Sequence, residues 1–150
     1  MDCLFCGIIA GKIPSKKVYE DASCVAFLDI NPANPGHALV VPKIHAENLF
    51  DADDESLKAA IVAVKKVATM VKDRTGCQGV NVVQNNGKAA GQIVSHVHFH
   101  VIPRNTGDSV VISYPRKQTD EKELDMMAAT LTKKKSAALD EEIMREMRRI

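Results

Sequence analysis

Three of the five histidines in the chain occur at every second position of one short segment, as His96, His98 and His100. The positions between them are apolar, and this period-two alternation of β-branched and aromatic residues predicts a half-buried strand over residues 95–103. Residues i, i+2 and i+4 of a strand share one face, so neighbouring imidazoles would point the same way, roughly 6.5–7 Å apart. We expect the apolar residues between them to face the core.

A row of imidazoles can do several kinds of chemistry. The unperturbed pKa of histidine, about 6.5, lies near neutrality, so the side chain can act as a nucleophile, an acid or base, a hydrogen-bond donor to phosphate or a metal ligand. The alternative is a strand with a merely polar, solvated face. Three histidines in register, in a chain with only two others, favour a phosphate-handling or metal-binding site over that alternative.

A pair of cysteines near the start of the chain, Cys3 and Cys6, precedes the short apolar segment Gly7–Ala10. In a cytosolic protein the Cys-x-x-Cys spacing suits zinc, because two thiolates separated by two residues can bind one tetrahedral ion. The pair supplies only two of the four ligands, however. A redox pair is expected near a βαβ pattern, which the sequence does not show, and two small buried hydrophobic residues remain the alternative.

Length and charge limit the classes of function. A chain of 150 residues predicts one domain with a single core, and a hydrophobic fraction of 45% is ordinary for a globular protein. The formal net charge of +1 argues against a surface that binds nucleic acid, although it is compatible with a small phosphate site.

The compartment can be inferred from the apolar segments. No apolar run approaches the ~20 residues that a membrane helix needs. The N-terminal residues include no basic region and only a short apolar patch, which is not the pattern of a signal peptide. We therefore expect a cytoplasmic protein without membrane contact, whose four cysteines are free thiols or metal ligands rather than disulfides.

One long helix is predicted over Asp53–Thr75, where apolar residues recur with helical spacing. The expected apolar stripe consists of Leu57, Ile61, Val64, Ala68 and Val71. Asp53 or Asp54 can cap the start of the helix, and Gly76 suits the left-handed position after its end. We expect this helix to pack on a sheet and to take no part in chemistry.

Four further segments predict strands. They are residues 18–20, 24–28, 38–42 and 79–84, of which the first two predict a hairpin. Loops are expected at residues 29–37 and at residues 85–92, where Asn86-Gly87 is a strong turn signal. The fold class that follows is α+β, with an antiparallel sheet of about five strands and one long helix packed on it.

The rest of the chain predicts a helical extension. Residues 109–113 are expected to form a short strand or an extended segment, and residues 120–131 and 136–150 to form helices. The last of these has a narrow apolar stripe made of Leu139, Ile143, Met147 and Ile150. We expect a functional domain over residues 1–115 and a C-terminal helical extension of that domain over residues 116–150.

The segment Gly91–Arg104, with sequence GQIVSHVHFHVIPR, resembles the signature of the histidine triad superfamily of nucleotide hydrolases and transferases. The resemblance covers about residues 2–104. It implies that His98 attacks an α-phosphorus and forms a nucleotidyl-histidine intermediate that water then hydrolyses. His100 and loop amides would stabilise the phosphate, Gln92 would lie near the phosphate and leaving group, and His96 would support the strand.

The resemblance also implies a nucleoside pocket. Asp29 would accept hydrogen bonds from the ribose hydroxyls, and Ile30 and Phe27 would offer apolar surface to a purine base. His37 would lie at the pocket wall. The remaining expected nucleotide contacts are Asn85, Gly91, Gln92, Ile93, Val94, His98 and His100. As alternatives from the residues alone, Asp29 could form a turn and Ile30 could belong to the core.

A zinc site is implied by similarity to a bacterial-type subset of the family. In that subset a downstream histidine and the first histidine of the triad complete the site of the cysteine pair, and the matching positions are His45 and His96. With Cys3 and Cys6 they would hold a structural zinc that ties the N-terminal arm to the sheet. Catalysis itself would need no cofactor.

The chain departs from the family at Ile93, where many members carry a hydroxyl residue that can donate to the phosphate or leaving group. Isoleucine cannot donate, so catalysis could be slower, or leaving-group preference shifted, relative to the phosphoramidase branch. The prediction is a homodimeric hydrolase or transferase that acts on a nucleoside phosphoramidate or a dinucleoside polyphosphate and releases AMP. A non-catalytic nucleotide-binding scaffold is one alternative, and an enzyme with catalytic zinc on His96, His98 and a third histidine is another.

Overall fold

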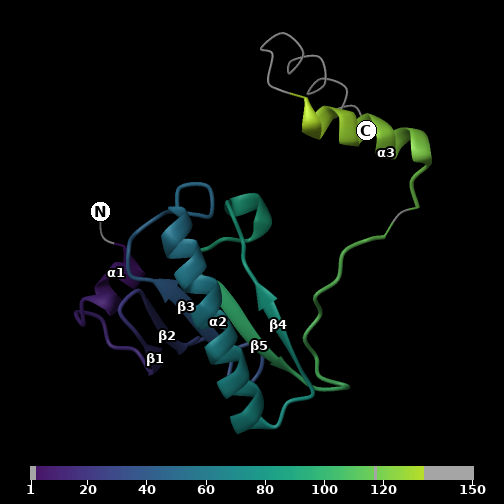
Figure 1. The fold of residues 1–150 in the computed structure, drawn as a ribbon. Coiled ribbons are helices and arrows are strands. Elements are labelled where there is room, and N and C mark those ends of the chain that lie inside the picture. Colours follow the sequence, from purple (N-terminus) through teal and green to yellow (C-terminus); the bar gives the residue numbers. More distant parts are fainter. Residues whose placement is uncertain (1–2, 117, 134–150) are drawn as a thin grey trace. The chain divides into compact units, whose positions relative to one another are not determined.

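The computed structural model describes residues 3–116 and 118–133, and Figure 1 traces the chain. The chain divides into two compact units between Val111 and Ile112. The division that the sequence predicts after residue 115 stays a prediction.

A five-stranded sheet forms the centre of the first unit. Its strands are β1 (Lys17–Glu20), β2 (Cys24–Leu28), β3 (Ala38–Pro42), β4 (Gly79–Val83) and β5 (Phe99–Arg104). They lie in the order β1-β2-β3-β5-β4, and every neighbouring pair is antiparallel. The predicted hairpin of β1 and β2 is present, and the α+β class with an antiparallel sheet of five strands is confirmed.

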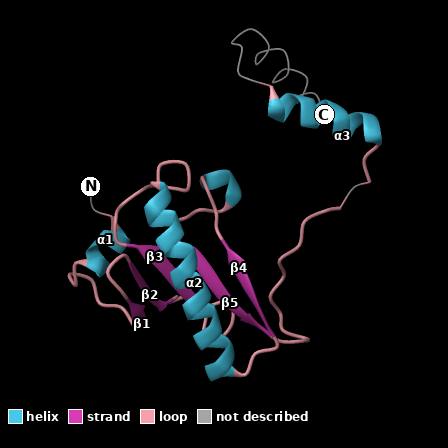
Figure 2. Cartoon of the chain, viewed as in Figure 1, coloured by secondary structure: helices cyan, strands magenta, loops and turns pink. Residues whose placement is uncertain are grey.

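Helix α2 (Asp54–Thr75) lies across one face of this sheet (Figure 2). Its ends are where the sequence predicts them. The Asp53 carboxylate caps the start by accepting a hydrogen bond from the backbone N–H of Ser56, at 2.9 Å. Gly76 has φ of 67° after the last turn, a left-handed conformation that glycine adopts without steric cost.

The apolar stripe of α2 differs from the prediction. Its buried face consists of Ala60, Ala63, Val64, Val67 and Val71. Val64 and Val71 are in the expected stripe, but Ile61 is 53% exposed. The reason is that alanine side chains at 60 and 63 let the helix backbone approach the sheet closely, so the contact favours small residues over the larger aliphatic ones.

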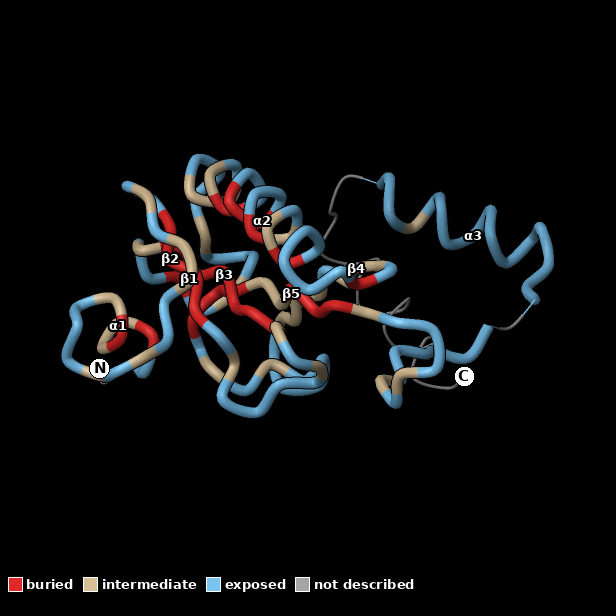
Figure 3. Tube along the Cα trace, turned by 90° about the horizontal axis from the view of Figure 1, so that it is seen from below, coloured by how far each residue is buried: buried red, intermediate tan, exposed pale blue. Residues whose placement is uncertain are grey.

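Helix α1 (Leu4–Ile9) packs against the other face of the sheet at β2 and β3, and the sequence did not predict it. Phe5 and Ile8 are buried in a second apolar cluster, whose other buried members are Val25, Phe27, Leu39 and Val41. These alternate along β2 and β3 with the residues that pack on α2, as side chains on opposite faces of a sheet must. Figure 3 shows the buried residues concentrated in β2, β3 and β5 and in the parts of α1 and α2 that face the sheet. A helix of six residues is too short to reveal a helical period in the sequence.

The histidine segment begins its strand later than predicted. β5 starts at Phe99, whereas a strand over residues 95–103 was expected. The backbone before it bonds to loops instead of a strand, since Val97 N–H donates to Ala46 O at 2.8 Å and His96 N–H donates to Val94 O at 2.9 Å. The predicted alternation of faces persists, because Phe99 and Val101 pack in the cluster under α2 whereas His96 and His98 meet Phe5 of the other cluster, although these two histidines are buried as well.

In the second unit, α3 (Glu121–Thr132) begins after an Asp120 cap, close to the predicted bounds. Residues 109–113 were expected to be a strand or extended segment, and in the described part of the chain they pair with no strand. The helix predicted over residues 136–150, with its apolar stripe, lies outside the described residues. Among the residues that are described, none of the helices has both the length and the apolar character needed to cross a bilayer.

The packing of α2 predicts a difference between two helix positions. Ala63→Leu should lower the free energy of unfolding by about 1–3 kcal/mol, because a larger side chain overpacks the contact with the sheet. Ile61→Ala should change it by less than about 0.5 kcal/mol, because Ile61 is exposed. Urea unfolding followed by circular dichroism measures both. A larger decrease in the free energy of unfolding for Ile61→Ala than for Ala63→Leu would support the apolar stripe expected from the sequence.

Candidate active site and metal site

Three histidines from two distant segments of the chain meet beside the β3–β5 pairing. His37 immediately precedes β3, His100 lies in β5, and His98 lies in the segment leading into β5. His37 Nε2 lies 2.9 Å from His100 Nδ1, and the rings of His98 and His100 have centroids 5.0 Å apart. His37 and His98 are buried, and His100 is half-buried. The structure thus brings together the second and third histidines of the row with one from a distant loop.

A hydrogen bond to a backbone carbonyl determines which nitrogen of His98 is free. Nδ1 of His98 lies 2.6 Å from the carbonyl oxygen of His96. A carbonyl can only accept, so in the neutral ring the hydrogen is on Nδ1. The lone pair is therefore on Nε2, which is the nitrogen able to attack an electrophile.

The hydrogens on His37 and His100 follow from a similar argument. His37 Nδ1 lies 3.0 Å from the backbone N–H of Ala33, a donor, so this nitrogen carries the lone pair. The hydrogen is then on His37 Nε2, which donates to His100 Nδ1. Neutral His100 consequently has its own hydrogen on Nε2. His98 and His100 therefore offer opposite groups, a lone pair and a donor.

Burial keeps all three rings neutral. Loss of solvation lowers the pKa of His37 and of His98 below the ordinary value for histidine. For His100 burial acts together with the neighbouring His98 and His37, and the pKa falls to about 4. The Asp29 carboxylate opposes this shift in each case without reversing it. At pH 7 the cluster can thus both accept and donate hydrogen bonds without carrying a charge.

The residues expected to hold a nucleoside lie in different environments. Asp29 Oδ2 is 3.7 Å from His37 Nε2, while its Oδ1 accepts the N–H of Asn31 at 2.8 Å, so Asp29 both forms the turn and faces the histidines. Ile30 is 91% exposed and is therefore not a core residue. Phe27 is buried against Phe5, with ring centroids 5.4 Å apart, rather than open to a ligand.

The loop before the histidines is held by the side chain of Gln92. Its Oε1 accepts the N–H of Gly87 at 2.8 Å, and its Nε2 donates to the carbonyls of Glu47 at 2.6 Å and Val94 at 3.0 Å. Gln92 thus binds backbone groups of two loops in this structure. Gly91 has φ of 85°, and a side chain there would reach the Asn85 amide. Ile93 is 93% exposed and shares an open cavity with Val94 and Cys3.

One residue of the site was missed by the sequence reasoning. The ring of Phe5 meets the ring of His98 edge to face, with centroids 5.1 Å apart and planes at 85°, and it also meets His96 at 6.0 Å. Such aromatic contacts orient the imidazoles and exclude water from them. The only signal in the sequence was the position of Phe5 inside the cysteine pair.

The four residues expected to bind zinc form a separate cluster. One ligand atom from each of Cys3, Cys6, His45 and His96 lies within 4.8 Å of all the others. His96 Nε2 donates to the carbonyl of Pro42 at 2.8 Å, so its Nδ1 carries a lone pair. That nitrogen lies 3.4 Å from Cys3 Sγ, 3.6 Å from Cys6 Sγ and 3.2 Å from His45 Nδ1.

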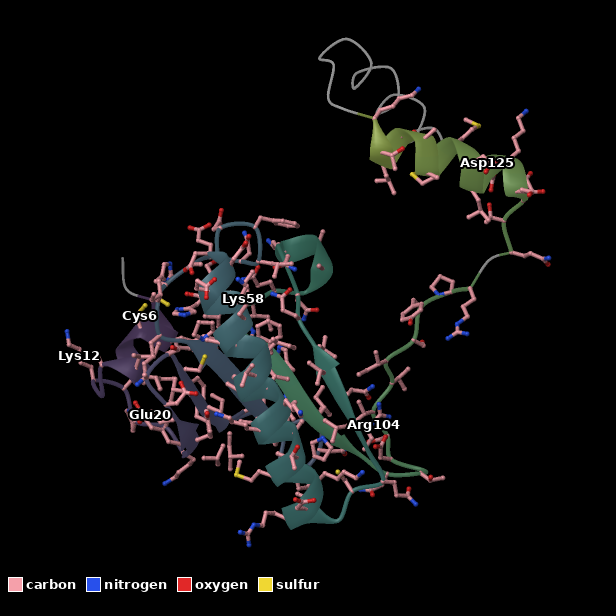
Figure 4. The ribbon with its side chains drawn as sticks, viewed as in Figure 1. Cys6, Lys12, Glu20, Lys58, Arg104 and Asp125 are labelled. Carbon is pink, nitrogen blue, oxygen red and sulfur yellow. The ribbon has the colours of Figure 1, made fainter. Side chains whose placement is uncertain are left out.

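This donor set fits a structural zinc ion. Two thiolates and two imidazoles are the ligands of closed tetrahedral zinc sites, and the carbonyl that orients His96 is a typical supporting contact. Burial and the neighbouring Cys3 raise the pKa of the Cys6 thiol, so metal binding there would release a proton. Cys6 lies in α1 near the N-terminus in Figure 4. In the described residues, His98 belongs to no group of three possible ligands, so the catalytic zinc considered from the sequence, on His96, His98 and a third histidine, has no matching ligand set. A second group of three possible ligand side chains is formed by Asp29, His37 and His100.

Comparison with known proteins identifies the family. The family model of the HIT domain matches residues 10–107. The chain belongs to the HIT family. It is 40% identical over 135 residues to the adenosine 5′-monophosphoramidase hnt1 of Schizosaccharomyces pombe, an alignment that covers 89% of this chain and 98% of the relative. The family resemblance that the sequence indicated is thereby confirmed.

Solved structures support the same assignment. A HIT family member from Bacillus subtilis has a TM-score of 0.84 at 40% identity, covering 91% of this chain and 99% of that one. A Zn-bound histidine triad family protein from Mycobacterium smegmatis has a TM-score of 0.70 at 35% identity, covering 95% and 98% of the two chains. The fold is therefore that of the HIT family.

The low pKa of His100 predicts how stability depends on pH. In the unfolded chain this histidine titrates near its ordinary pKa of about 6.5, but in the folded protein the pKa is about 4. Between these values the unfolded state binds the extra proton, so stability falls as the pH is lowered from 6.5 towards 4. His98, His37 and Asp29 face the same ring and modulate the effect.

We expect the melting temperature of the wild type to fall more between pH 7 and pH 5 than that of His100→Gln, because the variant lacks the group that takes up this proton on unfolding. Differential scanning calorimetry at several pH values measures the difference. Equal slopes for the two proteins would contradict a buried, neutral His100.

Proposed function

We propose that this protein is a nucleotide hydrolase that cleaves at the α-phosphate of a purine nucleotide, a nucleoside phosphoramidate or a dinucleoside polyphosphate, through a nucleotidyl-histidine intermediate. The observation that carries the proposal is the pairing of a free Nε2 lone pair on His98 with an Nε2–H donor on His100. Attack on a phosphorus requires the first, and the growing negative charge on the phosphate oxygens requires the second.

The reaction would proceed in two displacements. Nε2 of His98 bonds to the α-phosphorus while the bond to the leaving group breaks, and the leaving amine or phosphate takes up a proton from solvent. Water then attacks the same phosphorus and returns a proton to solvent, the bond to Nε2 breaks with its electron pair going back to the nitrogen, and the nucleoside monophosphate leaves. The carbonyl of His96 holds the Nδ1–H of the His98 ring throughout, which favours the positive charge that this ring carries in the intermediate.

Substrate recognition follows from the residues around the histidines. The Asp29 carboxylate, beside His37, can accept hydrogen bonds from ribose hydroxyls. The exposed side chain of Ile30 offers apolar surface to a base. Phe27, buried against Phe5, would support the residues around the pocket without offering a surface to the base. The loop around Asn85 and Gly91, with Val94, would approach the phosphate.

Gln92 would act on the reaction by holding this loop, since its amide binds the backbone of Gly87 and Val94 and ties them to the carbonyl of Glu47 in another loop. The monophosphoramidase name of the Schizosaccharomyces pombe relative supports a phosphoramidate as the first substrate to test.

A second candidate is a nucleotide-binding protein without turnover. Ile93, 93% exposed beside the phosphate loop, favours it because its side chain cannot donate to a phosphate or leaving group. Binding of AMP without release of AMP from any substrate would identify this function.

We further propose that the protein is a cytoplasmic homodimer. β4 is an edge strand of the described sheet, and its Val82 is partly exposed, which supports pairing with a second copy. The small net charge supports a small-molecule partner rather than a nucleic acid.

The decisive experiment compares wild type with His98→Ala on adenosine 5′-phosphoramidate and on a diadenosine polyphosphate. The wild type should release AMP in the presence of EDTA, because no reaction step involves a metal. His98→Ala should lower kcat at least about 1,000-fold, because it removes the nucleophile. Chromatographic detection of AMP measures both, and Lys58→Ala, an exposed change on α2, is the control.

The relative rates on the two substrates rank the two classes of leaving group. If His98→Ala released AMP as fast as the wild type, the covalent mechanism would be wrong. If EDTA abolished activity while the fold was retained, the catalytic zinc considered from the sequence would replace it.

We also propose that Cys3, Cys6, His45 and His96 hold a structural zinc ion, which would tie α1 to the segment before β5. The wild type should bind one zinc ion, with a higher melting temperature than the chelated protein, because only the folded state assembles the four ligands. Cys6→Ser should lose the ion. Cys77→Ser should keep it, because Cys77 is buried outside the cluster.

Metal analysis and thermal melts measure these effects. Zinc bound as tightly by Cys6→Ser as by the wild type would rule out this site.

A further inference from the structure

The loop between β2 and β3, residues 29–37, carries Asp29 and His37 and is fastened to the end of β5 by one side chain. The Asn34 amide nitrogen Nδ2 donates to the carbonyl of Pro103 and to Oδ2 of Asp108, both at 2.9 Å. Both hydrogens of the amide are used in this way. The backbone carbonyl of Asn34 in turn accepts the N–H of His37 at 3.0 Å.

The acceptor that Asn34 binds is itself held in place. Arg104, at the end of β5 (Figure 4), binds Asp108 through two parallel hydrogen bonds, from Nε to Oδ2 at 2.8 Å and from Nη2 to Oδ1 at 2.7 Å. The backbone N–H groups of Asn105 and Val110 also donate to this carboxylate, at 3.0 and 3.1 Å. A bidentate pair with two further donors fixes the position of the carboxylate, and with it the position of Asn34.

The position of Asn34 bears directly on the ring of His37. The residue before it, Ala33, supplies the backbone N–H that donates to His37 Nδ1. This contact is what places the hydrogen of His37 on Nε2, and Nε2 then donates to His100. If the turn at Ala33 moved, His37 could carry its hydrogen on either nitrogen, and His100 Nδ1 would lose a fixed donor.

We propose that Asn34, held by Asp108 and Arg104, is a positioning residue that fixes the tautomer of His37 and thereby the direction of the hydrogen on His100. The Nε2–H of His100 is the group that would donate to the phosphate. The hydrogen-bonded group of Asn34, Asp108 and Arg104 therefore determines, through His37, which nitrogen of His100 carries this hydrogen. The effect on rate rests on the proposed function, whereas the effect on the tautomers does not.

A purely structural role for the same contacts makes a different prediction, and the chain offers a matched control. Asn81 on β4 likewise belongs to this network, because its Oδ1 accepts a hydrogen bond from Arg104 Nη1 at 2.6 Å, but among the described residues its side chain forms no hydrogen bond with residues 29–37. Asn34→Ala and Asn81→Ala therefore each remove an asparagine from the same guanidinium network. Only Asn34→Ala releases the turn that holds the His37 ring.

The test is nitrogen NMR of the histidine side chains in the full chain at pH 7. In the wild type, Nδ1 of His37 and Nδ1 of His100 should both be unprotonated. In Asn34→Ala, His37 should show a mixture of the two tautomers, and His100 should show a mixture as well because it loses its fixed donor at Nδ1. Asn81→Ala should keep the wild-type pattern even if it melts at a lower temperature. Asn34→Ser, which retains a residue suited to turns, repeats the test if Asn34→Ala does not fold.

Kinetics on adenosine 5′-phosphoramidate give the second reading. Asn34→Ala should lower kcat about 10- to 100-fold, because a misdirected donor no longer meets the phosphate, and Asn81→Ala should keep kcat within about twofold of the wild type. Wild-type tautomers in both Asn34 variants, or an equal shift in Asn81→Ala, would overturn the inference. Shifted tautomers in a protein without hydrolase activity would uphold it while the proposed function failed.

Discussion

The hydrogen bond from Nδ1 of His98 to the backbone carbonyl of His96, 2.6 Å long, is the contact on which the site depends. It leaves Nε2 of His98 free for attack. It forms only when the backbone from His96 to His98 holds one conformation. That conformation is fixed on one side by the His96 ring, which binds the Pro42 carbonyl and faces the cysteine pair. The segment before β5 thus serves two sites: the His96 ring belongs to the metal cluster, and the His96 carbonyl belongs to the histidine cluster.

Burial gives these contacts their chemical effect. The two apolar clusters, one under α2 and one under α1, enclose the sheet, and the histidines lie at the edge of the second cluster beside Phe5. Loss of solvation disfavours the charged imidazolium, so the rings remain neutral and keep distinct donor and acceptor nitrogens. A solvated row of the same histidines would exchange protons and tautomers freely, and would not present a lone pair and a donor in fixed positions.

Hydrogen bonds between residues far apart in the sequence hold the remaining side chains of the site in place. His37 reaches His100 across 63 positions of sequence, and Gln92 joins the loop at Gly87 to Glu47. Each contact uses a polar group that would otherwise be left without a partner near the site, which is costly in a poorly solvated place. Such networks are strongest when every member is satisfied. In the described residues no buried side-chain nitrogen or oxygen lacks a hydrogen-bond partner.

The sequence by itself determined the antiparallel sheet, the bounds and caps of α2, the family, and the residues from which both candidate sites are built. These features depend on local signals: the Asp53 cap, the glycine after the helix, and histidines at every second position. Only the tertiary structure decided that Ile61 is exposed, that Phe5 lies against His98, that β5 begins at Phe99, and which nitrogen of each histidine is free. These outcomes depend on how closely the helices approach the sheet and on hydrogen-bond partners many residues away. Neither produces a local pattern of residue types that could be recognised in the sequence.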